Sequence, residues 1–167
     1  MSTAVDILGT HVIQEIERWK AKFPEGRERS AVIAALHAVQ HADHYLTNAK
    51  MGAVAEYLGM SKVQVYEIAT FYSMYETEPV GRHHISVCTN ISCMLRGGEE
   101  ILAYIEGRLG IKVGESTPDG RIFLKQEEEC LAACCGAPMM IVDHIYHEDL
   151  TPEKVDAVLA AIDGGAD

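Results

Sequence analysis

Apolar residues in the first half of the chain return every three or four positions, which is the spacing of an amphipathic helix. Four such stretches are separated by short connections, and this arrangement is typical of a small helical bundle. Their inward-facing residues would be Val12, Ile16, Trp19 and Phe23; Val32, Leu36 and Val39; Met51, Val54, Ala55 and Leu58; and Val65, Ile68, Ala69 and Tyr72.

Polar caps and helix breakers predict where these helices begin and end. The first would end at Pro24, and the second would begin at Ser30, whose hydroxyl can cap a helix. The third, starting near residue 48, would stop at Gly59. A fourth would begin with a capping box, because Ser61 and Gln64 have the S-x-x-Q spacing.

The pattern changes near Pro79, which predicts a boundary between a helical bundle over residues 1–79 and a second domain over residues 80–167. The second part alternates between strand-like and helix-like stretches, and this mixture implies an α/β (α+β) domain with one shared core. The expected elements are strands at residues 84–88, 121–125 and 139–142, a helix at 97–109, and a last helix opened by Thr151 and Pro152.

The charge of the chain argues against nucleic acid as a partner. The net charge is −11; residues 1–80 carry 7 Lys and Arg against 10 Asp and Glu, and residues 81–167 carry 7 against 15. A phosphate backbone would be repelled by this surplus. No apolar run reaches the roughly 18 residues of a membrane span, and the first residues resemble neither a secretory signal nor a transit peptide. We therefore expect a cytoplasmic chain without direct membrane insertion.

Five cysteines, all after position 87, form the main chemical motif. Cys88 and Cys93 have x4 spacing, Cys130 and Cys134 have x3 spacing, and Cys135 follows directly. In a chain without an export signal, metal binding or redox chemistry is a more common use of cysteine than disulfides. Four thiolates suit an iron–sulfur cluster or a zinc ion. Spacing alone leaves both open, together with redox-active or buried thiols.

Long stretches around these cysteines resemble one family. The matching segments, in order and spacing, are residues 66–75, 79–88, 93–96, 109–120, 129–140 and 146–154. They are similar to the 24 kDa [2Fe–2S] subunits of respiratory complex I, the NADH:quinone oxidoreductase. The resemblance implies an N-terminal helical bundle followed by a thioredoxin-like [2Fe–2S] ferredoxin domain. It also implies one [2Fe–2S] cluster held by Cys88, Cys93, Cys130 and Cys134.

The resemblance further implies an electron-transfer subunit without a flavin or NADH site of its own. Its cluster would exchange single electrons with the flavin of an adjacent NADH-oxidising subunit. Other peripheral-arm subunits would be further partners, and the assembled complex would hold the chain at the cytoplasmic face of the membrane. The equivalent small subunit of an NAD-linked formate dehydrogenase or hydrogenase is the alternative.

Two residues near the cysteines depart from the family pattern. Ala132 stands where the family usually has glycine, so this loop needs either ordinary dihedral angles or some strain, because alanine tolerates positive φ poorly. Cys135 is a fifth cysteine, which we expect not to replace Cys134. Glu127–Glu129 precede Cys130, and we hypothesise that their charge lowers the reduction potential. Screened, solvated carboxylates are the alternative.

Other motifs are weaker. His37 and His41 have i, i+4 spacing, but without an H-E-x-x-H context an exposed helix face is the simpler interpretation, as it is for the histidines near residues 84 and 147. The stretch 53–75 resembles a helix-turn-helix, which would suit a redox-sensing regulator. Its second helix offers Lys62 and no arginine, so DNA binding is a remote alternative. A free thioredoxin-like oxidoreductase would need a C-x-x-C motif, which the chain lacks.

Overall fold

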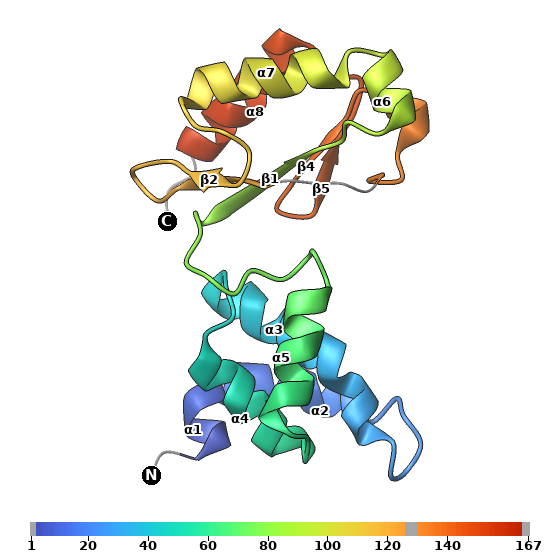
Figure 1. Ribbon diagram of the computed structural model, residues 1–167, viewed down its shortest axis with the longest axis vertical. Helices are drawn as coiled ribbons and strands as arrows, with labels where there is room; N and C mark the ends of the chain where they lie inside the picture. Colours follow the sequence, from blue (N-terminus) through green and yellow to red (C-terminus); the bar gives the residue numbers. More distant parts are fainter. Residues whose placement is uncertain (1–2, 126–129, 165–167) are drawn as a thin grey trace. The chain divides into compact units, whose positions relative to one another are not determined.

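The computed structural model describes residues 3–125 and 130–164, with the side chains of residues 163 and 164 left out of the description. The backbone divides into two compact units, Met1–Pro79 and Val80–Asp167. Each has its own apolar core. Figure 1 shows helices alone in the first unit, and a sheet with helices in the second. The mixed helical and β-sheet class predicted from the sequence is therefore confirmed.

The first unit is built from amphipathic helices around one core. Ile16, Leu36, Val54 and Val65 are fully buried in it, as the apolar spacing predicts. The helices are α1 (Ala4–Leu8), α2 (Thr10–Lys20), α3 (Val32–Asp43), α4 (Asn48–Leu58) and α5 (Lys62–Phe71), with a 3₁₀ turn at Glu28–Ala31.

Two details of the first unit differ from the sequence expectation. The segment before Pro24 contains two helices, α1 and α2, because Gly9 has a φ of 79° at their junction. The prediction that Ser30 caps the next helix is wrong: Ser30 lies within the 3₁₀ turn, and its N–H donates to the Arg27 carbonyl at 3.0 Å. Ala31 takes the N-cap position of α3 without a side-chain bond. A residue already in a helical turn lacks the extended backbone of a capping residue.

The second unit contains a five-stranded sheet in the order β2-β3-β1-β4-β5. Strand β1 pairs in parallel with β3 and antiparallel with β4, and the fully buried Ile85 stands opposite Leu124 and Val142. The strands are β1 (His83–Val87), β2 (Glu115–Ser116), β3 (Ile122–Lys125), β4 (Met140–Val142) and β5 (Ile145–His147). The helices are α6 (Ile91–Leu95), α7 (Gly98–Leu109) and α8 (Pro152–Gly164), with a 3₁₀ turn at Cys134–Gly136.

Helices α7 and α8 contribute to the same core as the central strands. Ile105 of α7 and Val155 of α8 are fully buried in one cluster with Ile85 and Leu124, and Figure 1 shows both helices on one side of the sheet. Thr151 caps α8 as predicted, because its hydroxyl accepts the N–H of Lys154 at 3.3 Å. The short elements α6, β2 and β5 were not predicted, because two to five residues carry little periodic signal. Within the described residues, no helix has the length and apolar character needed to cross a membrane.

The capping box of α5 gives a stability test. The Ser61 hydroxyl accepts the Gln64 N–H at 3.3 Å, and the Gln64 side chain accepts the Ser61 N–H at 3.1 Å. Ser61→Ala should therefore lower the free energy of unfolding by about 1 kcal/mol, measured by urea denaturation. Ser61→Asp retains the cap and should stay near the wild-type value. Equal stability of Ser61→Ala and the wild type would contradict the role of this cap.

Candidate functional site

Four of the five cysteines lie where the loops at one end of the sheet meet. Cys88 follows the last residue of β1, and Cys93 lies in α6; their exposed fractions are 1% and 2%. Cys130 and Cys134 lie on the loop that leads to β4 and are exposed. Cys88 and Cys93 form a small apolar cluster with Ala137 and Met139, and Leu131 and Ala133 pack against it.

The thiols form two neighbouring pairs. The sulfur atoms of Cys130 and Cys134 are 3.4 Å apart. The Cys93 side chain makes a hydrogen bond with Cys88 and also interacts electrostatically with Cys134. The fold thus brings together the four residues that the sequence resemblance marks as ligands. Cys135 is a third exposed cysteine on the same loop.

The backbone pairing of β1 with β4 explains this convergence. The last residue pair of the two strands is Val87 with Met140. One step further, the Cys88 N–H donates to the Met139 carbonyl at 3.1 Å. This bond holds the start of the first cysteine loop beside the end of the second. Residues far apart in the sequence therefore share one end of the sheet.

Burial disfavours ionisation of one of the thiols. Burial raises the pKa of Cys93 well above that of an ordinary thiol, and the hydrogen bond with Cys88 raises it further. A thiol in low-dielectric surroundings loses the hydration that would stabilise its thiolate. Burial therefore makes the Cys93 thiolate costlier to form than an ordinary thiolate. A metal held by this residue would bind the thiolate and so release its proton.

The distance within one thiol pair fits two ligands of one tetrahedral metal. Among the described residues, no three or more His, Cys, Asp or Glu side chains surround a single metal position. A [2Fe–2S] cluster needs no such group, since each of its two irons takes two protein ligands. Two thiolates on one tetrahedral metal, with bonds of about 2.3 Å, would stand roughly 3.7 Å apart. The 3.4 Å between Cys130 and Cys134 is close to that separation.

The backbone at Ala132 answers whether its loop has ordinary dihedral angles or strain. Its φ is 65°, so the loop does adopt the left-handed conformation in which glycine is usual. In this conformation the Ala132 N–H donates to the Cys130 sulfur at 3.4 Å. A backbone N–H directed at a ligand sulfur stabilises the thiolate and tunes a cluster's potential. We hypothesised that the charge of the glutamates at 127–129 lowers the reduction potential. Those glutamates lie outside the described residues.

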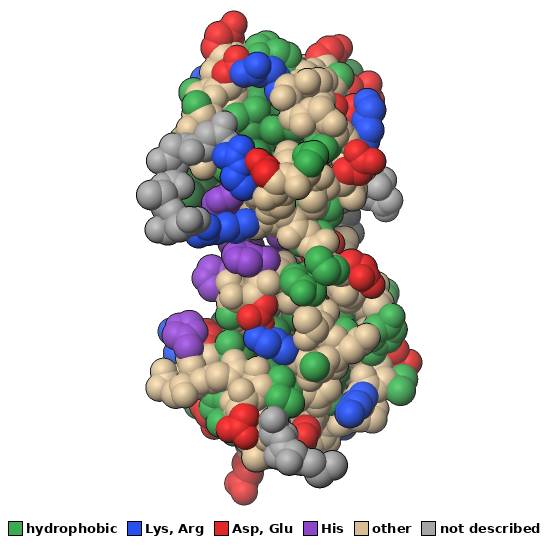
Figure 2. Space-filling model, turned by 90° about the vertical axis from the view of Figure 1, so that its left-hand side faces the viewer, with side chains coloured by type: hydrophobic (Ala, Val, Ile, Leu, Met, Phe, Trp, Pro, Cys, Tyr) green, Lys and Arg blue, Asp and Glu red, His purple; other side chains and the backbone are tan. Residues whose placement is uncertain are grey.

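The remaining motifs offer no comparable site in the described part of the chain. His83 instead bonds the Asp143 carboxylate at 2.6 Å in the sheet unit, and His37 and His41 lie on α3. On the face in Figure 2, Lys and Arg side chains are interspersed with Asp and Glu. That face gives the DNA-binding alternative no added support, since such proteins need a continuous basic surface.

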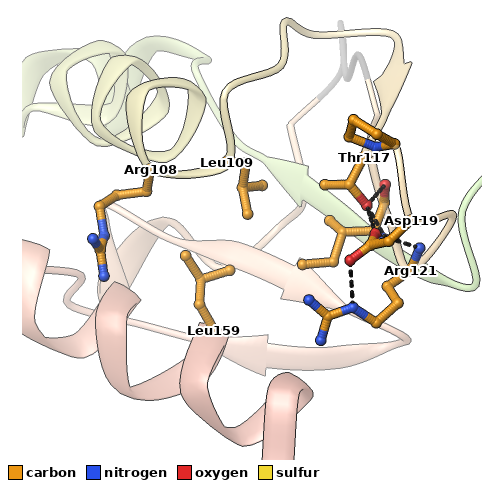
Figure 3. A pocket seen from close by; sticks show the side chains of 8 residues that line it. Arg108, Leu109, Thr117, Asp119, Arg121 and Leu159 are labelled. Atoms are coloured by element: carbon orange, nitrogen blue, oxygen red, sulfur yellow. Dashed lines mark hydrogen bonds and ion pairs between the residues drawn. The ribbon is translucent and has the colours of Figure 1, made fainter.

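A hollow of about 290 Å³ lies elsewhere in the second unit. Figure 3 shows Arg108 and Arg121 at its edge and Leu109 and Leu159 in its wall. Arg121 is paired with Asp119 at 2.6 Å, and Arg108 with Asp156 at 2.8 Å. Both guanidinium groups thus already have carboxylate partners. The lining contains no cysteine, so this hollow is separate from the thiol pairs.

Comparison with known proteins gives consistent matches over most of the chain. A family model described as thioredoxin-like [2Fe-2S] ferredoxin matches residues 16–163. An NADH-quinone oxidoreductase subunit of Rhizobium meliloti (strain 1021) is 44% identical over 146 residues, covering 87% of this chain and 85% of that protein. Another such subunit, from Rickettsia bellii (strain RML369-C), is 41% identical, covering 83% of each chain.

Two further matches are to proteins longer than this chain. The mitochondrial NADH dehydrogenase [ubiquinone] flavoprotein 2 of Dictyostelium discoideum is 39% identical over 82% of this chain and 56% of its own length. Among solved structures, an NAD⁺-reducing [NiFe]-hydrogenase in the air-oxidised state has a TM-score of 0.70 at 20% identity. That match covers 84% of this chain and 24% of the hydrogenase chain, and it shows a shared fold.

The strain at Ala132 can be measured directly. A left-handed conformation costs alanine about 1–2 kcal/mol, whereas glycine costs about 0.4–1 kcal/mol in unfolded-state entropy. Ala132→Gly should therefore raise the free energy of unfolding by about 0.5–1 kcal/mol, measured by urea denaturation under anaerobic, reducing conditions. Ala133, with a φ of −115°, provides the matched control. Ala133→Gly should lower stability, and a gain in that variant or none in Ala132→Gly would refute the assignment of strain.

Proposed function

The chain belongs to the thioredoxin-like [2Fe-2S] ferredoxin family, and on that basis we propose that it is an electron-transfer subunit of an NADH:quinone oxidoreductase. The proposed ligands of its single [2Fe–2S] cluster are Cys88, Cys93, Cys130 and Cys134. The observation that carries this proposal is the meeting of two thiol pairs at one end of the sheet. When bound, such a cluster takes up and releases one electron at a time.

The two thiol pairs would hold a cluster in different surroundings. Buried Cys88 and Cys93 would anchor one side in the apolar interior. The Ala132 N–H would stabilise negative charge on the Cys130 sulfur. Cys130 and Cys134 are exposed, so a redox partner can approach from their side. Burial on one side and access on the other suit electron exchange with a docked protein.

The partner that we propose is the flavin-bearing, NADH-oxidising subunit, with other peripheral-arm subunits in the same assembly. The relatives' names describe subunits of NADH-quinone oxidoreductases, which implies partner chains. In this proposal the chain binds neither flavin nor NADH itself, and it reaches the cytoplasmic face of the membrane through the complex. The hydrogenase likeness concerns the fold alone at 20% identity. The equivalent subunit of a hydrogenase or formate dehydrogenase is the second candidate. The proteins that copurify with the chain would distinguish the two.

Helix α6 provides a candidate docking face for that partner. It carries Cys93, yet Ile91, Met94 and Leu95 on the same helix are 68%, 44% and 76% exposed. The helix contains no charged residue. Apolar side chains left in water beside a functional group commonly mark a protein interface. We propose that the flavin-bearing subunit covers this face.

The cluster assignment is tested on protein purified without oxygen. We expect two irons and two acid-labile sulfides per chain, and an EPR signal from a one-electron-reduced cluster after dithionite treatment. Cys134→Ser should lose the cluster, whereas the adjacent control Cys135→Ser should retain it. Stoichiometric zinc without sulfide would refute the cluster, and loss in Cys135→Ser alone would reassign the ligand.

The docking face is tested by placing one charge on it. Leu95→Glu should weaken binding to the flavin-bearing subunit by roughly tenfold or more, because a carboxylate would be buried without a partner. Ile145→Glu is the matched control, since Ile145 is 64% exposed and lies on β5 of the same unit. Both variants should keep the wild-type EPR signal. Equal losses of affinity in the two variants, or a larger one in Ile145→Glu, would place the interface elsewhere.

A further inference from the structure

Gly98, the first residue of α7, lies against the backbone of both cysteines of the first thiol pair. It is buried, and a β-carbon added to it would stand 2.8 Å from the Cys88 carbonyl oxygen. The same β-carbon would stand 2.9 Å from both the carbonyl carbon and oxygen of Cys93. All three atoms belong to the backbone, which cannot rotate away as a flexible side chain does. Because Gly98 has no side chain, the Cys88 and Cys93 backbones can both pack against its Cα.

The surrounding hydrogen bonds leave these loops little room to adjust. The Cys88 N–H is bound to the Met139 carbonyl at 3.1 Å, and the Cys93 carbonyl accepts the Arg96 N–H at 3.1 Å. The Gly97 N–H donates to Met94 at 3.2 Å, which closes the turn between α6 and α7. A methyl group at position 98 must push apart segments that are held on their other sides.

We propose that Gly98 is a positioning residue that sets the separation and orientation of the Cys88 and Cys93 thiols for cluster binding. The inference rests on the proposed [2Fe–2S] function of this site. A residue that contacts the ligands but not the metal can alter metal affinity by roughly 10–100-fold. Gly98 would act by fixing the backbone from which both thiols extend.

Two other glycines of the same unit provide matched controls for Gly98→Ala. Gly107 also lies in α7, and a β-carbon there would meet no atom within 4 Å. Gly81 is more crowded still, since its β-carbon would stand 2.4 Å from the Ile122 backbone. It lies before β1, at the opposite end of that strand from Cys88. Gly107→Ala therefore controls for the helix, and Gly81→Ala controls for general destabilisation.

The experiment compares the three variants with the wild type, as isolated chains and within the assembled complex, where binding stabilises the folded state. Only Gly98→Ala should shift the g values and midpoint potential of the reduced cluster and lose iron to a chelator roughly tenfold faster. Complete loss of the cluster in Gly98→Ala alone would also support the proposal. Wild-type g values, potential and iron retention in Gly98→Ala, or the same changes in Gly81→Ala, would overturn it. A wild-type chain without iron and sulfide would instead refute the underlying function.

Discussion

The pairing of β1 with β4 is the constraint on which the cysteine site depends. Val87 stands opposite Met140, and the Cys88 N–H extends the pairing to Met139 at 3.1 Å. The centre of the sheet is held by the fully buried Ile85, which both neighbouring strands flank. A stable central strand thus fixes the start of one cysteine loop against the end of the other. A site built from two thiol pairs requires this contact between the loops, because each pair by itself supplies only two thiols.

The site combines a protected side and an accessible side. Cys88 and Cys93 are withdrawn from water, and burial raises the pKa of the Cys93 thiol. Cys130 and Cys134 face solvent, where a partner can come close. Burial protects Cys88 and Cys93 from oxidation, which is fastest at accessible thiolates. Helix α6 carries Cys93, so the proposed docking face and one proposed cluster ligand belong to the same helix.

Two backbone positions restrict which residues the cysteine segments can accept. Ala132 has a φ of 65°, which directs its N–H at the Cys130 sulfur. Gly98 has no side chain where one would collide with the Cys88 and Cys93 backbones. The conformation is costly at Ala132, and the space is restricted at Gly98; the surrounding fold maintains both. Such positions are concentrated at functional sites, because precise placement of a reactive group often requires them.

The sequence by itself determined features that depend on near neighbours. The capping box at Ser61, the stop at Gly59, the Thr151 cap and most of the apolar core positions follow from residues within one or two helical turns. Tyr72, predicted to face inward, is instead exposed. Cysteine spacing and flanking segments also pointed to a four-thiolate site. The tertiary structure alone decided which thiols are buried, that Ala132 is left-handed, and that Gly98 touches two loops. These properties depend on contacts between distant segments, and no local pattern of residues encodes them.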